Sequence, residues 1–183
     1  MNLKKLFAIL PLLSIAYLAV AQGPLITKDS ETSFFSSAPL EDIEAINKQT
    51  TAALDISKGE IVVKMLIKHF EFEKKLMQEH FNENYMESEK YPSAIFKGKF
   101  TSAEPIDVNS DGEYEVDVNG EMTIHGVTKP MGCKGTIIIK DKKVAANTKF
   151  TVKTKDFDIK IPKLVVKNIA EEIEVTSNLV FGK

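Results

Sequence analysis

The chain contains 183 residues, with 24 basic and 26 acidic side chains and a net charge of −2. Every one of the basic residues is lysine, and there is no tryptophan. Because bidentate recognition of phosphate and of guanine relies on arginine, this composition disfavours a nucleic-acid-binding protein. The single cysteine, Cys133, cannot form an internal disulfide, so we expect a fold that depends on packing alone, with Cys133 as a small buried residue.

The first 21 residues have the features of a secretion signal peptide. Lys4 and Lys5 precede a mostly apolar run over residues 6–18, and a small-x-small cleavage site ends at Ala21. An uncleaved membrane anchor is the alternative, but the apolar run is short for a helix that spans a bilayer. We therefore expect a mature chain of residues 22–183, the length of a single domain, that is periplasmic or secreted.

The first part of the mature chain is expected to contain strands and one helix-like segment. After a loose lead-in over residues 22–28, residues 31–38 are expected to form a strand. Residues 39–48 are expected to be helical, because a proline starts the segment and acidic side chains follow near its positive end. Residues 51–56 and 59–72 have the composition of strands, with a turn between them.

Residues 73–86 change to a helical period. Leu76, Met77, Phe81 and Tyr85 recur at spacings of about three and four, which predicts a short amphipathic helix with one apolar stripe. Such a helix can cap a filled core, or it can form a lid over a ligand-binding mouth. The sequence pattern is the same in both cases, so both interpretations stay open.

The clearest strand lies in the second half of the chain. From Tyr114 to Ile124, apolar residues and Gly120 occupy every second position, and polar residues lie between them. This two-residue period predicts a strand with one apolar and one polar face, and its length suits a closed antiparallel barrel. Pro130 is expected to end this region, within a break over residues 129–132.

Four further strands complete the expected fold. Residues 94–101 alternate, and residues 109–112 form a hairpin turn. Three more strands are expected over residues 134–140, 144–153 and 172–181. The sequence thus predicts a mainly β fold, an antiparallel β-barrel of about eight strands with one or two short helices.

Residue types that support catalysis or metal binding are sparse. The histidines His69, His80 and His125 fall on different expected elements and lack a metal-ligand spacing. No nucleophile motif or glycine-rich phosphate loop occurs, so we expect no enzyme activity, no metal site and no cofactor. His125 is the one candidate for a reactive group in an enzyme that acts on a lipid, and its place after Ile124 puts it on the polar side of its strand.

The interior of such a barrel can be filled or hollow. An eight-stranded barrel is just wide enough to be filled by side chains or to hold one small ligand. Gly98, Gly120 and Gly126 lie on otherwise apolar faces, where each removes a side chain and favours interior space. Equally, these glycines can mark bends or bulges. A filled barrel would be a structural or interaction module that acts through its surface.

Three segments resemble the YceI-like family. Y-P-S-A-I-F-K-G-K-F over residues 91–100 is similar to its Y-P-x-A-x-F strand opening, and G-E-M-T-I-H-G-V-T-K over residues 120–129 is similar to G-x-L-T-I-x-G-V-T-K. F-T-V-K-T-K-D-F-D-I over residues 150–159 is similar to F-x-I-x-R-S-D-F-G-I, with Thr154 and Asp158 in place of the arginine and the glycine. The order and spacing of the three segments fit the family over roughly residues 51–183.

The resemblance implies a lipocalin-like periplasmic barrel that binds a polyisoprenoid or another long-chain amphiphile in its interior. Transport, storage or sequestration of that lipid in the cell envelope is the implied role. Nucleic acid is not an expected partner, transient membrane contact is allowed, and the oligomeric state is open. The residues expected to line the interior are Phe70, Phe72, Met77, Phe81, Phe96, Phe100, Val118, Met122 and Ile124.

Overall fold

Alternating apolar and polar residues build nine strands in residues 23–182, the part of the chain that the computed structural model describes. The expected signal peptide of residues 1–21 lies outside these described residues. The strands are β1 (Leu25–Ser37), β2 (Asp42–Asp55), β3 (Glu60–Leu66), β4 (Glu71–Phe72), β5 (Ser93–Ser102), β6 (Gly112–Ile124), β7 (Val127–Lys140), β8 (Lys143–Lys153) and β9 (Glu172–Phe181).

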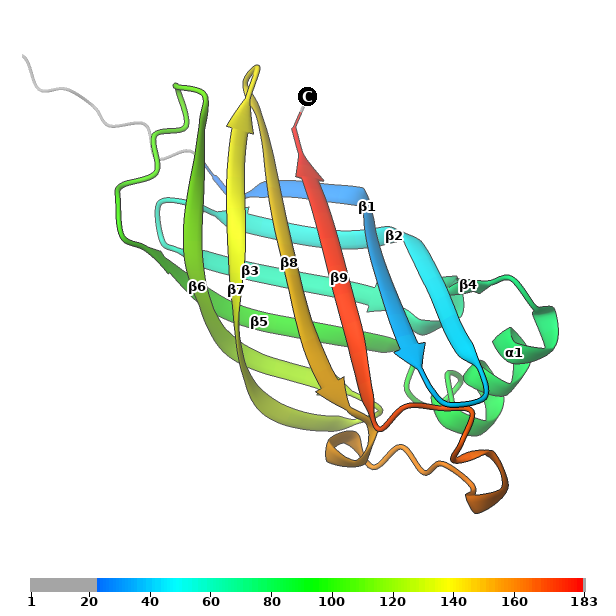
Figure 1. Cartoon of the computed structure of the whole chain (residues 1–183). Helices are drawn as coiled ribbons and strands as arrows, with labels where there is room; N and C mark the ends of the chain where they lie inside the picture. The colour runs from blue at the N-terminus through cyan, green and yellow to red at the C-terminus, as the bar shows by residue number, and fades with distance from the viewer. Residues whose placement is uncertain (1–22, 183) are drawn as a thin grey trace, which may run out of the picture.

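The eight long strands close into an antiparallel barrel (Figure 1). They follow the order β1, β9, β8, β7, β6, β5, β3 and β2, and β2 pairs with β1 to complete the ring. The two-residue β4 adds to the other side of β2. Closure removes the exposed strand edges of an open sheet, and the prediction of a mainly β barrel of about eight strands is confirmed.

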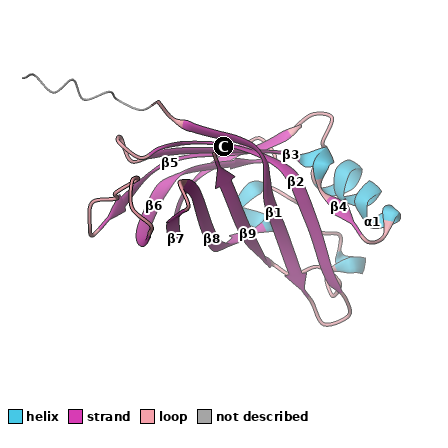
Figure 2. Ribbon diagram, turned by 90° about the horizontal axis from the view of Figure 1, so that it is seen from above, coloured by secondary structure: helices cyan, strands magenta, loops and turns pink. Residues whose placement is uncertain are grey.

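The helical segment expected over residues 73–86 is present. It consists of α1 (Lys75–His80), which continues directly into a π-helical turn over Phe81–Tyr85. In Figure 2, α1 lies to one side of the strands. Short 3-10 turns lie at Ile67–His69, Thr154–Phe157 and Lys163–Val165.

The helix expected over residues 39–48 is wrong, because from Asp42 on this segment belongs to the long strand β2. Ala45 and Asn47 point into the barrel while Asp42 and Glu44 are exposed, which is a two-residue period. β2 pairs along most of its length with β1, so tertiary pairing decides the conformation. The lead-in is also more ordered than expected, since β1 begins at Leu25, opposite Leu54.

The strand expected over residues 59–72 is interrupted. The strand β3 ends at Leu66, and the 3-10 turn Ile67–His69 separates it from β4. The N–H of Ile67 donates to the carbonyl of Pro92 at 2.9 Å, and the N–H of Phe70 donates to the carbonyl of Ile67 at 3.2 Å. These bonds turn the chain away from the barrel wall and toward α1.

The break expected over residues 129–132 is also wrong. The hairpin between β6 and β7 turns at His125 and Gly126, which have φ values of +50° and +77°. Two successive residues with positive φ form the tight turns that suit the twist of a hairpin. Pro130 lies within β7, opposite Glu121. The proline therefore does not end the strand, and β7 runs unbroken from Val127 to Lys140.

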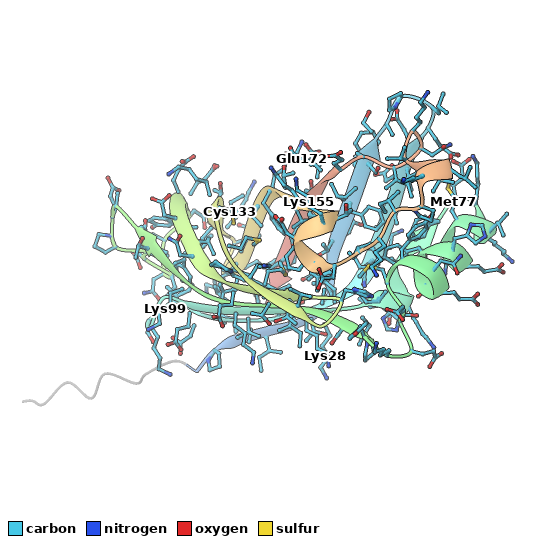
Figure 3. All side chains as sticks on the ribbon, turned by 90° about the horizontal axis from the view of Figure 1, so that it is seen from below. Lys28, Met77, Lys99, Cys133, Lys155 and Glu172 are labelled. Carbon is cyan, nitrogen blue, oxygen red and sulfur yellow. The ribbon has the colours of Figure 1, made fainter. Side chains whose placement is uncertain are left out.

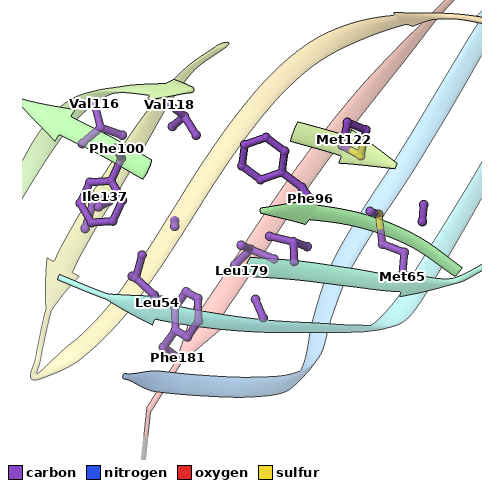
Figure 4. Packing of buried hydrophobic residues seen from close by; sticks show 14 of the residues in the cluster. Leu54, Met65, Phe96, Phe100, Val116, Val118, Met122, Ile137, Leu179 and Phe181 are labelled. Atoms are coloured by element: carbon purple, nitrogen blue, oxygen red, sulfur yellow. The ribbon is translucent and has the colours of Figure 1, made fainter. Parts of the chain in front are cut away.

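The two faces expected for β6 are confirmed. Val116, Val118 and Met122 are at most 9% exposed, whereas Asp117 and Glu121 lie on the exposed outer face. The inward side chains meet those of the other strands to form the core in Figure 4.

Two glycines expected to leave interior space mark a close approach of strands instead. Gly98 and Gly120 lie opposite each other on β5 and β6. A Cβ atom on Gly120 would lie 2.3 Å from the carbonyl oxygen of Lys97 and 2.5 Å from the Cα of Gly98. No side chain fits in that gap, so these positions favour the interpretation as bends.

Candidate functional site

A cavity of about 280 Å³ lies at the end of the barrel next to α1. Its walls come from inward side chains of the barrel, from α1 and its π-helical turn, and from the segment of residues 154–169. Figure 3 shows this segment, in orange, beside the green helix that carries Met77. The lining is almost entirely apolar, so the cavity suits a hydrocarbon ligand better than a polar one.

Four phenylalanines form one wall and attach the helix to the barrel. The ring of Phe34 on β1 lies 5.4 Å from Phe70, 5.7 Å from Phe72 and 5.4 Å from Phe81, measured between centroids. Phe72 and Phe81 are 5.0 Å apart. Ring pairs at such distances stabilise the contact beyond the area they bury. The cluster holds the helical segment over the open end of the barrel.

The helical stripe expected from the sequence is divided between cavity and solvent. Met77, Phe81 and Tyr85 line the cavity, whereas Leu76 is 62% exposed. No residue of the helix itself is fully buried. Of the two interpretations left open by the sequence, this arrangement favours a lid over a mouth rather than a cap on a filled core.

The nine residues expected to line the interior fall into two groups. Six of them lie around the cavity, and the other three lie around a second, smaller cavity of about 60 Å³ deeper in the barrel. Whether any of them contacts a ligand stays a prediction. The first group is Phe70, Phe72, Met77, Phe81, Met122 and Ile124, and the second is Phe96, Phe100 and Val118.

The two cavities share three lining residues. Met65 on β3, Met122 on β6 and Phe150 on β8 contribute to both. Met65 and Met122 are 6% and 2% exposed, so they are part of the core and not of the mouth. Methionine is flexible enough to fill irregular gaps, and these side chains form the boundary between the wide and the narrow part of the interior.

Several residues of the lining were not identified from the sequence. The loop after β8 contributes one wall, and Phe157 in this loop is only 5% exposed. This segment has no clear period in the sequence, although Ile159 and Ile161 alternate with lysine and proline. The residues concerned are Phe34, Ile43, Phe150, Val152, Phe157, Ile159, Ile161, Val165, Ile169, Ile173 and Val175.

Polar groups occur at the rim of the cavity, where they join separate segments. Lys74 donates to Glu41 at 2.8 Å, and Asn168 donates to the other carboxylate oxygen of Glu41 at 3.4 Å. The hydrogen bond from Lys74 holds the pKa of Glu41 below its ordinary value, so this carboxylate is charged at neutral pH. Lys153 pairs in the same way with Glu172 at 3.1 Å.

The expectation that His125 lies on the polar face of a strand is wrong. Its side chain is only 10% exposed. Nε2 lies 2.8 Å from a carboxylate oxygen of Glu87, Nδ1 lies 3.2 Å from the carbonyl oxygen of Phe157, and the ring packs against Tyr91. His125 lines neither cavity and instead ties the segment after the helix to the loop after β8.

Two further properties of the described residues concern metals and cysteine. Within residues 23–182, no three His, Cys, Asp or Glu side chains lie close enough to hold a metal ion. Cys133 on β7 is partly buried, lies beside the small cavity and accepts a hydrogen bond from Thr148 at 3.4 Å.

No helix in the described part of the chain is long and apolar enough to cross a membrane.

Comparison with known proteins identifies a family that contains this sequence. The YceI-like domain matches residues 27–181. A UPF0312 protein of Pseudomonas putida strain W619 is 34% identical over 98 residues, which cover 50% of this chain and 47% of the relative. A UPF0312 protein of Pseudomonas fluorescens strain SBW25 is 40% identical over 72 residues, covering 35% of this chain and 38% of the relative. The matched segments therefore span less than half the length of these relatives.

Solved structures share the fold at lower identity. BcnA of Burkholderia cenocepacia has a TM-score of 0.70 and 18% identity, over 82% of this chain and 95% of BcnA. A polyisoprenoid binding domain from Saccharophagus degradans also has a TM-score of 0.70, with 14% identity over 86% of this chain and 96% of that domain. The YceI protein of Campylobacter jejuni has a TM-score of 0.57 and 14% identity, over 100% of this chain and 99% of that protein.

Proposed function

The chain belongs to the YceI-like family, and from that premise we propose that it binds a long-chain isoprenoid or a similar amphiphilic lipid inside its barrel. The bound lipid is transported, stored or sequestered in the cell envelope. The polyisoprenoid binding domain from Saccharophagus degradans, which shares the fold, supports an isoprenoid as the ligand.

The observation that carries this proposal is the apolar cavity of about 280 Å³ at the end of the barrel. Moving a hydrocarbon tail from water into such a space gains about 0.8 kcal/mol for each methylene group. A tail of several isoprene units therefore binds without a charged partner. The open rim leaves the polar head of the lipid in contact with water.

The polar side chains at the rim support binding rather than catalysis. Glu41 accepts hydrogen bonds from Lys74 and Asn168, and Ser36 accepts one from the backbone N–H of Ala170 at 2.9 Å. These contacts join the lid, the β1–β2 turn and the loop after β8. Catalysis would instead require a nucleophile or base directed at a bound substrate.

The signal-like segment of residues 1–21 supports export as part of the proposal. Cleavage after Ala21 leaves a chain that begins at Gln22. N-terminal sequencing of the protein recovered from the cell envelope is expected to read from Gln22. A recovered chain that still contains Leu12 or Leu13 would refute processing at this site.

Two substitutions of alanine by leucine test whether the cavity is the binding site. Ala94 is buried and lines the cavity, whereas Ala145 lies on β8 opposite the exposed Val180, on the outer wall. Ala94→Leu fills the space of two or three methylene groups, so affinity for a fluorescent long-chain isoprenoid analogue is expected to fall about tenfold. Titration of the matched control Ala145→Leu is expected to match the parent. Equal affinities for the two variants would exclude this cavity as the site.

A further inference from the structure

Four large apolar side chains are exposed at the same end of the barrel as the cavity. Leu164 is 96% exposed, Leu40 is 68%, Leu76 is 62% and Val166 is 51%. They come from three segments: the β1–β2 turn, α1, and the loop after β8. We name these four residues the apolar rim.

Hydrogen bonds place these three segments around the mouth of the cavity. The N–H of Leu40 donates to the carbonyl of Lys167 at 3.1 Å. The next residue, Glu41, accepts from Lys74 before α1 and from Asn168 in the loop. Glu41 and Asn168 both line the cavity, so the exposed residues beside them surround its opening.

The stretch of the loop after β8 that carries half of the apolar rim is basic. Residues 159–170 contain Lys160, Lys163 and Lys167, all exposed, and no acidic residue, whereas the exposed acids Asp156, Asp158 and Glu171 flank this stretch. None of these lysines forms an ion pair with another residue of the part of the chain that the structure describes. Of the acids in the other two segments, Glu41 is paired with Lys74, whereas Asp42 and Glu73 are exposed.

Exposed leucine and valine interspersed with lysine match the chemistry of an anionic bilayer surface. Apolar side chains insert at the boundary between headgroups and acyl chains, and lysines are attracted to anionic headgroups. We propose that the apolar rim and the lysines of residues 159–170 dock the protein on an anionic phospholipid bilayer, with the cavity mouth facing the membrane. This inference rests on the proposed function, because it gives the lipid tail a path between bilayer and cavity that avoids water.

The position of the rim favours a bilayer over a second copy of the chain. Leu164 projects from the loop almost completely into solvent, and the lysines beside it would face their own copies across a symmetric interface. Like charges facing each other oppose association, whereas an anionic surface neutralises all three lysines at once.

Vesicle flotation with the purified protein tests the docking surface. The parent is expected to float with vesicles of phosphatidylcholine that contain phosphatidylglycerol, and to float much less with phosphatidylcholine alone. Leu164→Glu combined with Val166→Glu is expected to lower the partition coefficient by about tenfold or more, because it replaces inserted apolar groups by charges that anionic lipid repels. Lys160→Gln, Lys163→Gln and Lys167→Gln together are expected to remove the preference for anionic vesicles.

The control is Val180→Glu, which places one negative charge, against two in the rim variant, at an exposed valine near the opposite end of β9. It is expected to float like the parent. If the rim variants also float like the parent, or if the parent fails to float, the docking surface is wrong. If the Leu164 variant changes the sedimentation of the protein but not its flotation, the rim is an interface between copies and the proposal is overturned.

Binding of a soluble lipid analogue, compared with extraction of lipid from vesicles, distinguishes membrane docking from lipid binding in the cavity. The Leu164 and Val166 variant is expected to bind a soluble isoprenoid analogue with the affinity of the parent, and to extract the same lipid from vesicles at least about tenfold more slowly. If extraction is as fast as in the parent, docking has no role in loading. If neither protein binds the analogue, the proposed function fails even where the parent floats with vesicles.

Discussion

The two halves of the barrel interior differ in how they are filled, although both are built from the same alternating strands. In one half, Phe100 and Ile137 are at most 7% exposed, and the cavity that both side chains line has a volume of about 60 Å³. At the α1 end the space is about 280 Å³, and its walls include the partly exposed Phe72 and Phe81. A two-residue period therefore directs side chains inward without determining whether they fill the interior.

The two halves differ in volume because different elements enclose them. In the narrow half, inward side chains such as Phe100 and Ile137 gather in the interior (Figure 4). Gly98 and Gly120 let β5 and β6 approach closely. In the wide half, the helix and the loop after β8 cover the opening, and hydrogen bonds at their edges hold them there. We infer that the narrow half supplies stability and the wide half supplies binding.

The largest expected effect is a charge in the narrow half. Val118→Asp buries a carboxylate at a position that is 9% exposed and is expected to destabilise the fold by about 4 kcal/mol or more. Glu121→Gln changes the outer face of the same strand and is expected to change stability by less than about 0.5 kcal/mol. Urea unfolding measures both. Similar losses in the two variants would contradict the assignment of inner and outer faces.

Truncation of one phenylalanine in each half is expected to have unequal effects on stability. Phe100→Ala opens a cavity in the narrow core, and the free energy of unfolding is expected to fall by about 3–5 kcal/mol. Phe72→Ala removes a ring that is already partly exposed beside the cavity, and a loss of about 1–2 kcal/mol is expected.

Lipid affinity is expected to show the opposite order, with Phe72→Ala weakening binding more than Phe100→Ala. Urea unfolding and titration with an isoprenoid analogue give the two orders. The same order in both measurements would mean that stability and binding are not divided between the halves.

The smallest expected effect concerns the ion pair that joins the lid to the barrel. The pKa of Glu41 is lowered from its ordinary value of 4.5, first by the hydrogen bond from Lys74. The pair therefore stabilises the lid above pH 4.5, and this contribution is lost as the pH falls through the lower pKa of the folded state. The protection factors of the α1 amides, which correct for the pH dependence of intrinsic exchange, are expected to fall with acidification in the parent. Glu41→Gln lacks this dependence, and an identical pH profile in the variant would show that another group is responsible.

Sequence periodicity predicted the elements whose inner and outer faces differ clearly. Residues 114–124 alternate strictly and form β6 with the expected inner and outer faces. The residues after Glu73, whose apolar side chains recur every three or four positions, form the helical lid. The local pattern at the first half of β2 predicts a helix, because proline and acidic residues, as at Pro39 and the acids that follow it, also occur at helix starts. Pairing with β1, which lies on the other side of a turn, overrides that local pattern.

The candidate site was only partly predictable for a related reason. Residues close in sequence to the lid were identified from local patterns, since Phe70 lies in the strand expected over residues 59–72 and Phe81 on the apolar stripe of the helix expected over residues 73–86. Phe34 contacts the same rings from β1, and no local period indicates that contact. The loop of residues 154–169 gains its structure from the rim hydrogen bonds and from burial of Phe157, which only the closed barrel provides.

Organic extraction of the protein purified from the cell envelope, followed by mass spectrometry, shows whether the barrel holds a lipid. One long-chain isoprenoid or related lipid is expected for each barrel, with less recovered from Ala94→Leu than from Ala145→Leu. If the parent yields no lipid and binds no added analogue, the wide half is an empty space without a ligand, and the lipid-binding function is contradicted.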